Sequence, residues 1–259
     1  MSKRGTNPRT VQVIAAIGVA AVVLPLVALA ARAPWRDIAL LGEPGARTAL
    51  LVSAEVSLAA AALAFVLGTP VALVLARGSF PGRSIVRGIA LLPLVLPPVV
   101  AGVGLLAAFG RLGLLGRGLA AIGIRLPFTT AGAVLASAFV ATPLLILTVE
   151  AGVRALDPQA EEAAETLGAS RWYVLRRVTL PAIAPQIAAG IVVAWARALG
   201  EFGATITFAG NVRGRTQTLP LAVFEAMQTD PGAAILMSLL LVALSLIALI
   251  ALRGRFFAR

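Results

Sequence analysis

The sequence predicts an all-α, polytopic membrane protein with about six transmembrane helices. Hydrophobic residues make up 59% of the 259 residues and charged residues only 13%. Soluble domains use roughly 45–50% apolar residues, so this chain is too apolar to be one. Six apolar stretches recur along the chain, each near the ~20 residues that a helix needs to cross a bilayer. Since no internal repeat is visible, we expect a single membrane domain over residues 11–259, after a cytoplasmic N-terminus of residues 1–10.

The first predicted span, residues 11–31, carries no charge, and Lys3, Arg4 and Arg9 precede it. Basic residues collect on the cytoplasmic side of spans, so this flank predicts that the N-terminus stays inside. A cleaved signal peptide is the competing interpretation, but the apolar run exceeds the ~7–15 residues of the usual signal-peptide core. We therefore expect the segment to be retained as a membrane helix.

The second predicted span, residues 50–76, holds Glu55 near its outer end. There the carboxylate either reaches water by snorkelling or faces the other helices. After this span, Arg77, Arg83 and Arg87 surround a turn that is rich in glycine and proline. Turn residues flanked by basic charge are typical of a short cytoplasmic hairpin.

The third predicted span, residues 86–109, contains Pro93, Pro97 and Pro98. Proline lacks a backbone N–H and interrupts the helical hydrogen bonds, so neighbouring helices must satisfy the freed carbonyls inside the membrane. We therefore predict a kink in this span. The kink either lines the bundle interior as part of a pathway or is a structural bend only.

The fourth, fifth and sixth predicted spans are residues 131–149, 183–208 and 232–252. A glycine-rich external loop, residues 110–130, precedes the fourth span, and a second external loop, residues 209–231, precedes the sixth. An even number of spans returns the chain to its starting side. Both termini and the loop after the fourth span are therefore expected in the cytoplasm.

The loop between the fourth and fifth spans, residues 157–181, reads DPQAEEAAETLGASRWYVLRRVTLP and is called the 157–181 loop below. Asp157 followed by Pro158 is a helix start, and Gly168 is a natural helix stop about ten residues later. Ser170 can cap a second helix, and Pro181 precedes the next apolar run. The loop therefore predicts two short helices between two spans.

The first of these short helices has one narrow face of mostly small apolar residues: Ala160, Ala163, Ala164 and Leu167. Glu161, Glu162 and Glu165 cover the remaining surface and suit the positive end of the helix dipole. Alanines let another surface approach closely, so this pattern favours docking to a partner rather than chemistry. An ordinary solvated connecting loop is the alternative.

The 157–181 loop resembles the EAA loop of ABC importer permeases. Glu162, Ala163 and Ala164 are followed by three residues, then Gly168, then nine residues and the sequence VTLP ending at Pro181, with valine where isoleucine is usual. Downstream, RALGEFGATITFAGN and RTQTLPLAVFEAMQ are similar to the molybdate permease branch, whose nearest relatives are the sulfate and tungstate permeases. The resemblance covers roughly residues 50–252.

This resemblance implies the type I ABC importer permease fold and a function as the transmembrane subunit of an ATP-driven molybdate importer that works by alternating access. Tungstate and sulfate/thiosulfate permeases are the alternatives for the cargo. The implied partners are two ATPase subunits, an extracytoplasmic oxyanion-binding protein, membrane lipid and a second copy of this chain, in the inner membrane of a bacterium. In that family the EAA loop is the coupling helix that docks in a groove of the ATPase. We therefore expect Glu162 to provide a polar contact, the alanines to allow a close approach, and Gly168 to form the turn between the short helices.

Arg197 and Glu201 lie well inside the fifth predicted span, four residues apart and thus on one helix face. Charges at such depth are costly unless they face protein or water, which makes the pair a candidate for the pathway or its gate. Gly203 lets the backbone bend or pack tightly beside the pair, and Thr205 follows it. The alternative is a pair that only locks the fifth span against a neighbour.

The distribution of basic residues agrees with this orientation. Of the 22 lysines and arginines, thirteen fall on the predicted cytoplasmic side, eight on the outer side and one, Arg197, within a span. The eight outer arginines and Thr205 would favour anions, although no residue is identified as an ion ligand.

The residue types that are missing restrict the chemistry. The chain has no cysteine and no histidine, which excludes disulfides, thiol nucleophiles and the usual zinc sites. Lys3 is the only lysine, so a phosphate-binding GxxxxGK[ST] loop is impossible and the chain is not its own ATPase. We expect no enzyme activity, cofactor, metal site or nucleic acid partner. A gradient-driven secondary transporter is the first rival, and it would need no docking loop. A membrane enzyme or scaffold is the second rival, but without histidine and cysteine its catalytic options are few.

Overall fold

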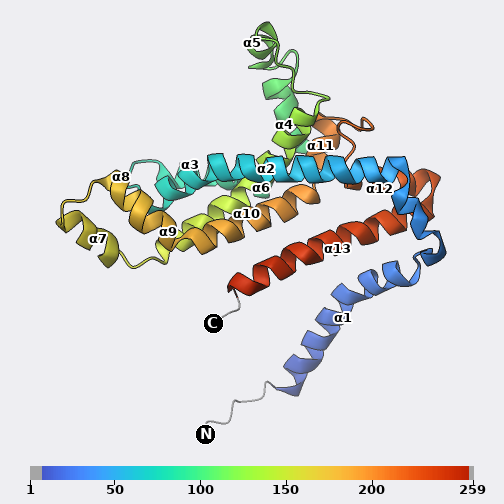
Figure 1. The fold of residues 1–259 in the computed structure, drawn as a ribbon, viewed down its shortest axis with the longest axis horizontal. Helices are drawn as coiled ribbons and strands as arrows, with labels where there is room; N and C mark the ends of the chain where they lie inside the picture. Colours follow the sequence, from blue (N-terminus) through green and yellow to red (C-terminus); the bar gives the residue numbers. More distant parts are fainter. Residues whose placement is uncertain (1–7, 257–259) are drawn as a thin grey trace.

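The computed structural model describes residues 8–256, with side chains up to residue 250. Three long helices, α2 (Pro44–Arg77), α6 (Thr130–Arg154) and α10 (Ala184–Leu199), pack side by side as the centre of a helical bundle (Figure 1). α13 (Pro231–Phe256) runs alongside them. The predicted basic residues Lys3, Arg4 and Arg259 lie outside the described residues.

Small side chains form the contacts among the three central helices. Lipid tails are as apolar as leucine, so membrane helices associate through close van der Waals packing, which small residues permit. Buried alanines come from all three helices: Ala60, Ala64 and Ala72 from α2, Ala138 and Ala141 from α6, and Ala194 and Ala198 from α10. Leu145 and Ile183 fill the spaces between them. The core therefore lies between helices that the sequence predicted as spans two, four and five.

The six predicted spans correspond to four single helices and two bent helix pairs within the described chain. α1 (Arg9–Ala31), α2, α6 and α13 are each long and apolar enough to cross a membrane. The bent pairs are Arg83–Leu94 with Pro98–Phe109, and Arg171–Ala182 with Ala184–Leu199. Counting each pair as one span gives six, as predicted.

The third span is broken more sharply than the sequence suggested. α3 (Arg83–Leu91) continues into the 3₁₀ turn η2 (Leu92–Leu94), and α4 (Pro98–Phe109) then leaves at 113°. Pro97 is extended, with φ −55° and ψ 131°, because a residue before proline avoids the helical region. The predicted kink is confirmed, and the span predicted over residues 86–109 corresponds to a helix pair that is sharply bent at this point. α4 projects sideways from the bundle and carries the next loop at its tip (Figure 1).

The fifth predicted span, residues 183–208, is also discontinuous. α10 ends at Leu199, a non-helical stretch follows, and α11 (Gly203–Phe208) begins again in a new direction. Phe202 has φ −129° and ψ −56°, outside the helical range. At its other end α10 meets the preceding short helices at 66°, just before Pro185. Apolar composition predicted a span here but could not reveal these two breaks.

Three helical segments occur where the sequence predicted loops. They are η1 (Trp35–Gly42), α5 (Gly116–Ala121) and α12 (Leu219–Thr229). α12 packs on α13 and α2, where Leu219, Ala222 and Ala226 are buried. Its tertiary packing, rather than a long apolar run, supports this helix.

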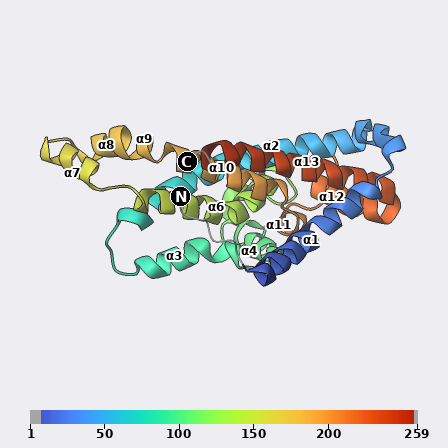
Figure 2. The same cartoon turned by 90° about the horizontal axis from the view of Figure 1, so that it is seen from below.

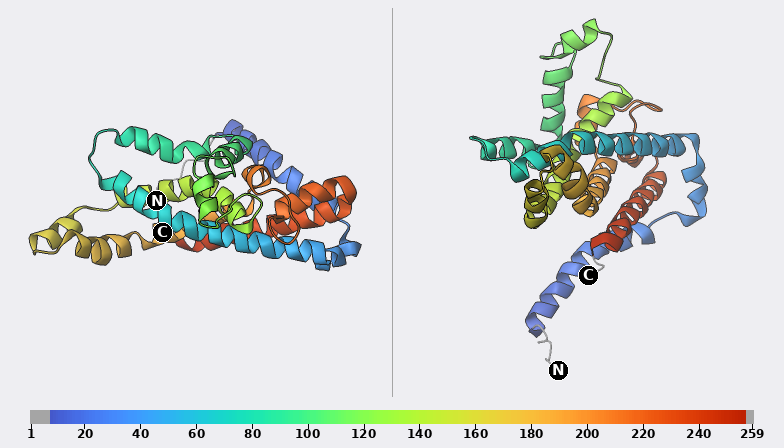
Figure 3. Two further views of the ribbon diagram at one scale, coloured as in Figure 1. Left: turned by 90° about the horizontal axis from the view of Figure 1, so that it is seen from above. Right: turned by 60° about the vertical axis from the view of Figure 1, so that its left-hand side comes forward.

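The two ends of the bundle differ. At one end the 157–181 loop forms α7 (Gln159–Thr166), α8 (Arg171–Val174), the π-helical turn η3 (Leu175–Thr179) and α9 (Leu180–Ala182). α12 lies at the opposite end (Figure 2). α1 diverges from the bundle in the right-hand view of Figure 3, and none of its residues is buried. The 157–181 loop is therefore a separate projection on one end of the molecule.

Candidate functional site

The predicted helix boundaries within the 157–181 loop are confirmed. The backbone N–H of Gln159 donates to Asp157 Oδ1 at 3.0 Å. Gly168 has φ +84°, a left-handed conformation that a side chain would strain, and it separates α7 from α8. The backbone N–H of Tyr173 donates to Ser170 Oγ at 3.3 Å, so Ser170 caps the second helix.

The tip of the 157–181 loop exposes apolar side chains. Leu167 is 88% exposed, Trp172 65% and Tyr173 55%. Beside them lies an open hollow of about 590 Å³, lined by Ala164, Leu167, Gly168, Ala169, Ser170 and Tyr173. Of the other predicted docking residues, Ala160, Glu162, Ala163 and Pro181 are exposed. The predicted apolar face is thus largely uncovered, which is unusual for a surface that meets only water.

Glu161, which the sequence did not distinguish from its neighbours, anchors α7 to the bundle. Its Oε2 lies 2.8 Å from Arg77 Nη2 at the end of α2, and Thr179 Oγ1 donates to its Oε1 at 2.6 Å. Thr179 belongs to the π-helical turn η3. One carboxylate therefore joins α7, η3 and α2. The three glutamates of α7 look alike in sequence, and only the position of Arg77 separates Glu161 from the others.

The predicted pair forms: Arg197 Nη2 lies 2.7 Å from Glu201 Oε2. The Glu201 side chain is 1% exposed and that of Arg197 29%. Glu201 Oε1 also accepts the backbone N–H of Ala204 at 2.9 Å. Glu201 therefore connects the end of α10 to the start of α11 across the break.

The breaks in the third and fifth spans meet beside this pair. A Cβ atom built on Gly203 would lie only 2.6 Å from Pro98 Cβ, and one on Gly102 only 2.5 Å from Thr207 Cβ. α4 and α11 therefore pack closely because glycines lie at both contacts. Gly203 and Thr205 are both buried.

Glu150 is a buried carboxylate that the sequence interpretation missed, because the fourth span was ended at residue 149. It is 1% exposed, and its Oε2 accepts from Arg87 Nε at 3.2 Å. Its Oε1 accepts from Nε and Nη2 of Arg154 at 3.0 and 2.7 Å. The spacing of Glu150 and Arg154, four residues apart, was the available signal. The cluster ties α3 to the end of α6.

At the α12 end, Glu225 organises the loop between α11 and α12. It accepts hydrogen bonds from Asn211 Nδ2 at 3.0 Å, from Gln217 Nε2 at 2.6 Å and from the Arg213 guanidinium. The hydrogen bond from Arg213 and the positive charge of Arg213 lower the pKa of Glu225 below its usual value, and the hydrogen bonds from Asn211 and Gln217 lower it further. Burial of the carboxyl group raises the pKa, but this effect is smaller.

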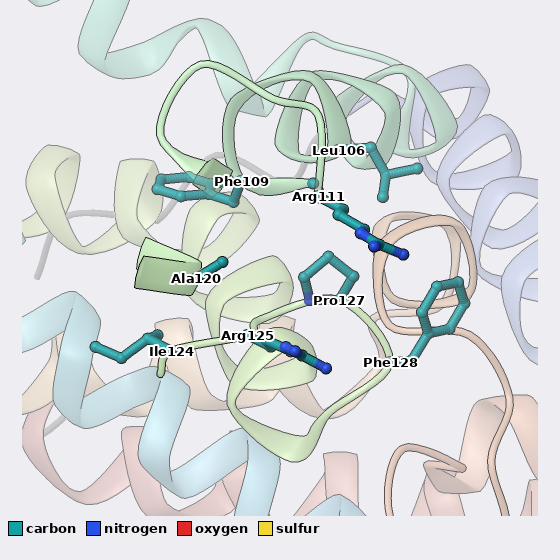
Figure 4. A pocket seen from close by; sticks show the side chains of 10 residues that line it. Leu106, Phe109, Arg111, Ala120, Ile124, Arg125, Pro127 and Phe128 are labelled. Atoms are coloured by element: carbon teal, nitrogen blue, oxygen red, sulfur yellow. The ribbon is translucent and has the colours of Figure 1, made fainter. Parts of the chain in front are cut away.

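The loop that follows α4 forms, together with α4, a cavity of about 520 Å³ that combines apolar and basic side chains. Phe109, Arg111, Arg125 and Phe128 contribute to its lining (Figure 4). Glu55 does not line this cavity and is exposed on α2.

Comparison with known proteins identifies the family. Residues 64–255 match the family described as binding-protein-dependent transport system inner membrane component. The chain belongs to this family. It is therefore a transport component and a multi-pass inner membrane protein, as the sequence predicted.

Members of this binding-protein-dependent transport family with similar sequences include molybdenum and sulfate permeases. The molybdenum transport system permease protein ModB of Mycobacterium tuberculosis is 48% identical over 251 residues, covering 96% of this chain and 94% of the relative. ModB of Escherichia coli is 42% identical, covering 78% and 90%. The sulfate transport system permease protein CysT of Escherichia coli is 38% identical, covering 74% and 70%.

Solved structures confirm the fold of this transport component. A bacterial ABC transporter involved in the import of alginate has a chain with TM-score 0.70 and 18% identity, covering 95% of both chains. A chain of the MetNI methionine ABC transporter gives TM-score 0.60 and 18% identity, covering 78% of this chain and 90% of its own. The predicted ABC importer permease fold is therefore correct.

Proposed function

We propose that this chain is the transmembrane permease subunit of an ATP-driven importer of molybdate. The observation that carries the proposal is its 48% identity, over 96% of its length, to a molybdenum transport system permease protein. The sulfate permease CysT, at 38% identity, supports an oxyanion as cargo and makes sulfate/thiosulfate the second candidate, with tungstate as a third.

The 157–181 loop is the proposed contact with the ATPase subunit. Its exposed Leu167 and open hollow supply an apolar surface, and the alanine face lets the partner approach closely. The contact of Glu161 with Arg77 gives the loop a firm connection to α2, so a displacement of α7 is passed to the bundle. In the proposed assembly two copies of this chain and two ATPase subunits bring two such loops together, and ATP drives alternating access. Both termini and this loop are cytoplasmic in the proposal.

The pathway is proposed to pass the junction of the two broken spans, next to Arg197, Glu201, Gly203 and Thr205. Discontinuous helices near the middle of the membrane often form the binding sites of transporters, because they free polar backbone groups within the bilayer. Arg197 is the partly exposed cation at this junction, and Glu201 holds it in place. Arg197 would attract an oxyanion, while the tight contact of Gly203 with Pro98 would form a gate.

Reconstitution tests the proposed function. The chain is co-expressed with the ATPase subunit and the binding protein of the proposed importer, and ATP-dependent uptake of labelled molybdate into proteoliposomes is measured. We expect uptake to require both partners. Excess sulfate should inhibit this uptake only weakly. Uptake by this chain alone would contradict the proposal and favour a gradient-driven transporter, and preferential uptake of sulfate would favour the second candidate.

Gly168→Val tests the coupling role of the loop. Since Gly168 has a positive φ, a side chain should distort the turn at a cost of about 1–2 kcal/mol and misplace the apolar tip. We expect uptake to fall at least tenfold while the complex still hydrolyses ATP. Gly118→Val is the matched control, since Gly118 lies in α5 with open space around it and an ordinary φ. Normal molybdate-stimulated ATPase activity and uptake in Gly168→Val would refute the coupling role.

A further inference from the structure

A basic cavity lies between α3 and the end of α6, and it shares no lining residue with the hollow at the tip of the 157–181 loop. It has a volume of about 760 Å³ and is lined by Arg83, Ser84, Arg87, Gly88, Leu91 and Arg154. Three of these lining residues are arginines, and none is acidic. The arginines come from two helices that are far apart in sequence, so folding brings them together.

Glu150 neutralises only part of this charge. It is buried beneath the arginines and pairs with Arg87 and Arg154. Three guanidinium groups and one carboxylate leave a local charge of +2. Cations held close together repel one another unless anions compensate them, so the cavity is short of negative charge.

The arginines also keep unused hydrogen-bond donors. A guanidinium group has five N–H donors. In the described structure Arg87 gives one to Glu150 and Arg154 gives two, both to the same carboxylate oxygen. Arg83 makes one long bond, from Nη2 to the backbone oxygen of Ala76 at 3.4 Å. The side chains of Arg87 and Arg154 are 44% and 46% exposed, so their remaining donors are accessible from the cavity.

We propose that this cavity binds a phosphate-type oxyanion. A tetrahedral anion with two or more charged oxygens would balance the excess charge, and its oxygens would match the planar donor pairs of arginine. Two sources share this chemistry, the phosphate of an anionic lipid headgroup at the membrane edge and a free inorganic oxyanion. The bound anion would connect Arg83 of α3 to Arg154 of α6 and hold the first half of the broken third span against the bundle.

Binding to the purified complex tests the site. The full transporter, in a maltoside detergent that contains no phosphate, is titrated in one arm with inorganic phosphate by equilibrium dialysis. In the other arm it is titrated with phosphatidylglycerol, and bound lipid is counted by native mass spectrometry. We expect one of the two probes to bind at one site per chain, and the arm that responds identifies the source.

Arg83→Gln is the variant of choice because Arg83 makes no ion pair with Glu150 in the described structure, so the link between α3 and α6 persists. Losing one charged donor should weaken binding of the responding probe about tenfold or more. Arg117→Gln, which removes an exposed arginine of α5, is the matched control and should bind like the unmodified chain. Equal binding by Arg83→Gln and Arg117→Gln, or no stoichiometric binding of either probe, would overturn the proposal.

A measurement on the unmodified complex avoids any folding defect of the variant. Phenylglyoxal modifies accessible arginines, and mass spectrometry reports the rate at each position. The responding probe should slow modification of Arg83 several-fold and leave Arg117 unchanged. If neither probe changed the rate of phenylglyoxal modification at Arg83, the proposed binding site would be contradicted. This result would hold even if the Arg83→Gln variant could not be purified.

Discussion

Glu150 and Glu201 are both 1% exposed carboxylates in the same bundle, yet they stabilise different kinds of contact. Glu150 pairs with two arginines and joins two helices, α3 and α6. Glu201 pairs with one arginine and accepts a backbone N–H, and so joins two halves of one broken span. A carboxylate with two cationic partners tolerates the loss of one of them. A carboxylate with a single cation does not, so the structure at the break depends on Arg197.

Arg197→Ala should give the largest effect. It leaves the buried Glu201 carboxylate without a cation, which costs about 3–5 kcal/mol and lowers the melting temperature of the complex. Uptake should also be lost. The double variant Arg197→Ala with Glu201→Gln removes the unpaired charge and should recover most of the stability. Recovery of uptake as well would mean that the pair serves only as a lock and not in the pathway.

Arg87→Ala should cost less than Arg197→Ala, about 1–2 kcal/mol, because Glu150 keeps both hydrogen bonds from Arg154. Arg87 is also 44% exposed, so solvent already screens its charge. Thermal unfolding of the two variants side by side measures the difference. A loss for Arg87→Ala as large as that for Arg197→Ala would show that the number of cationic partners does not decide the cost.

Glu161→Gln extends the comparison to a surface carboxylate. The Glu161 side chain is 18% exposed and pairs with one arginine, Arg77, which is itself 39% exposed. We expect a loss of stability below about 1 kcal/mol, because partly exposed pairs contribute little. The coupling of ATP hydrolysis to uptake should fall more clearly, since α7 loses its link to α2. Glu165→Gln, on the same helix and without an ion pair in the described structure, is the control and should couple normally.

Glu225→Gln should have the smallest effect, and that effect should depend on pH. Since the folded pKa of Glu225 is lowered, its ionised form stabilises the fold above the unfolded pKa of about 4.3, and this contribution is lost as the pH falls through the folded pKa. The difference in melting temperature between the unmodified chain and Glu225→Gln should therefore be constant from pH 7 down to about 5 and shrink as the pH falls below about 4.3. A difference that stays constant down to about pH 3 would contradict the ion pair with Arg213.

The number and positions of the apolar helices followed from the sequence, because each span needs an apolar stretch of fixed length. The kink in the third span also followed, because prolines interrupt the helical hydrogen bonds. The break after Leu199 did not, since Gly200 and Phe202 lie within an apolar run whose composition is the same whether the helix continues or stops. The turn at Gly168 was predicted correctly because only glycine adopts its backbone angles easily.

Among the site residues, the pairing of Arg197 with Glu201 was predictable from their spacing on one helix. The contacts of Glu150 with Arg87 and of Glu161 with Arg77 were not, since each joins helices whose relative placement the sequence does not specify. The roles of the loop and the pathway residues remain predictions.

α1 has 23 residues and buries none of them, so the rest of this chain does little to fix how it is rotated or tilted. Its orientation must come from its surroundings, whether acyl chains or a neighbouring subunit. A spin label placed along α1 would consequently report on those surroundings, and comparing spectra from solitary and assembled chains would map where a neighbour touches it.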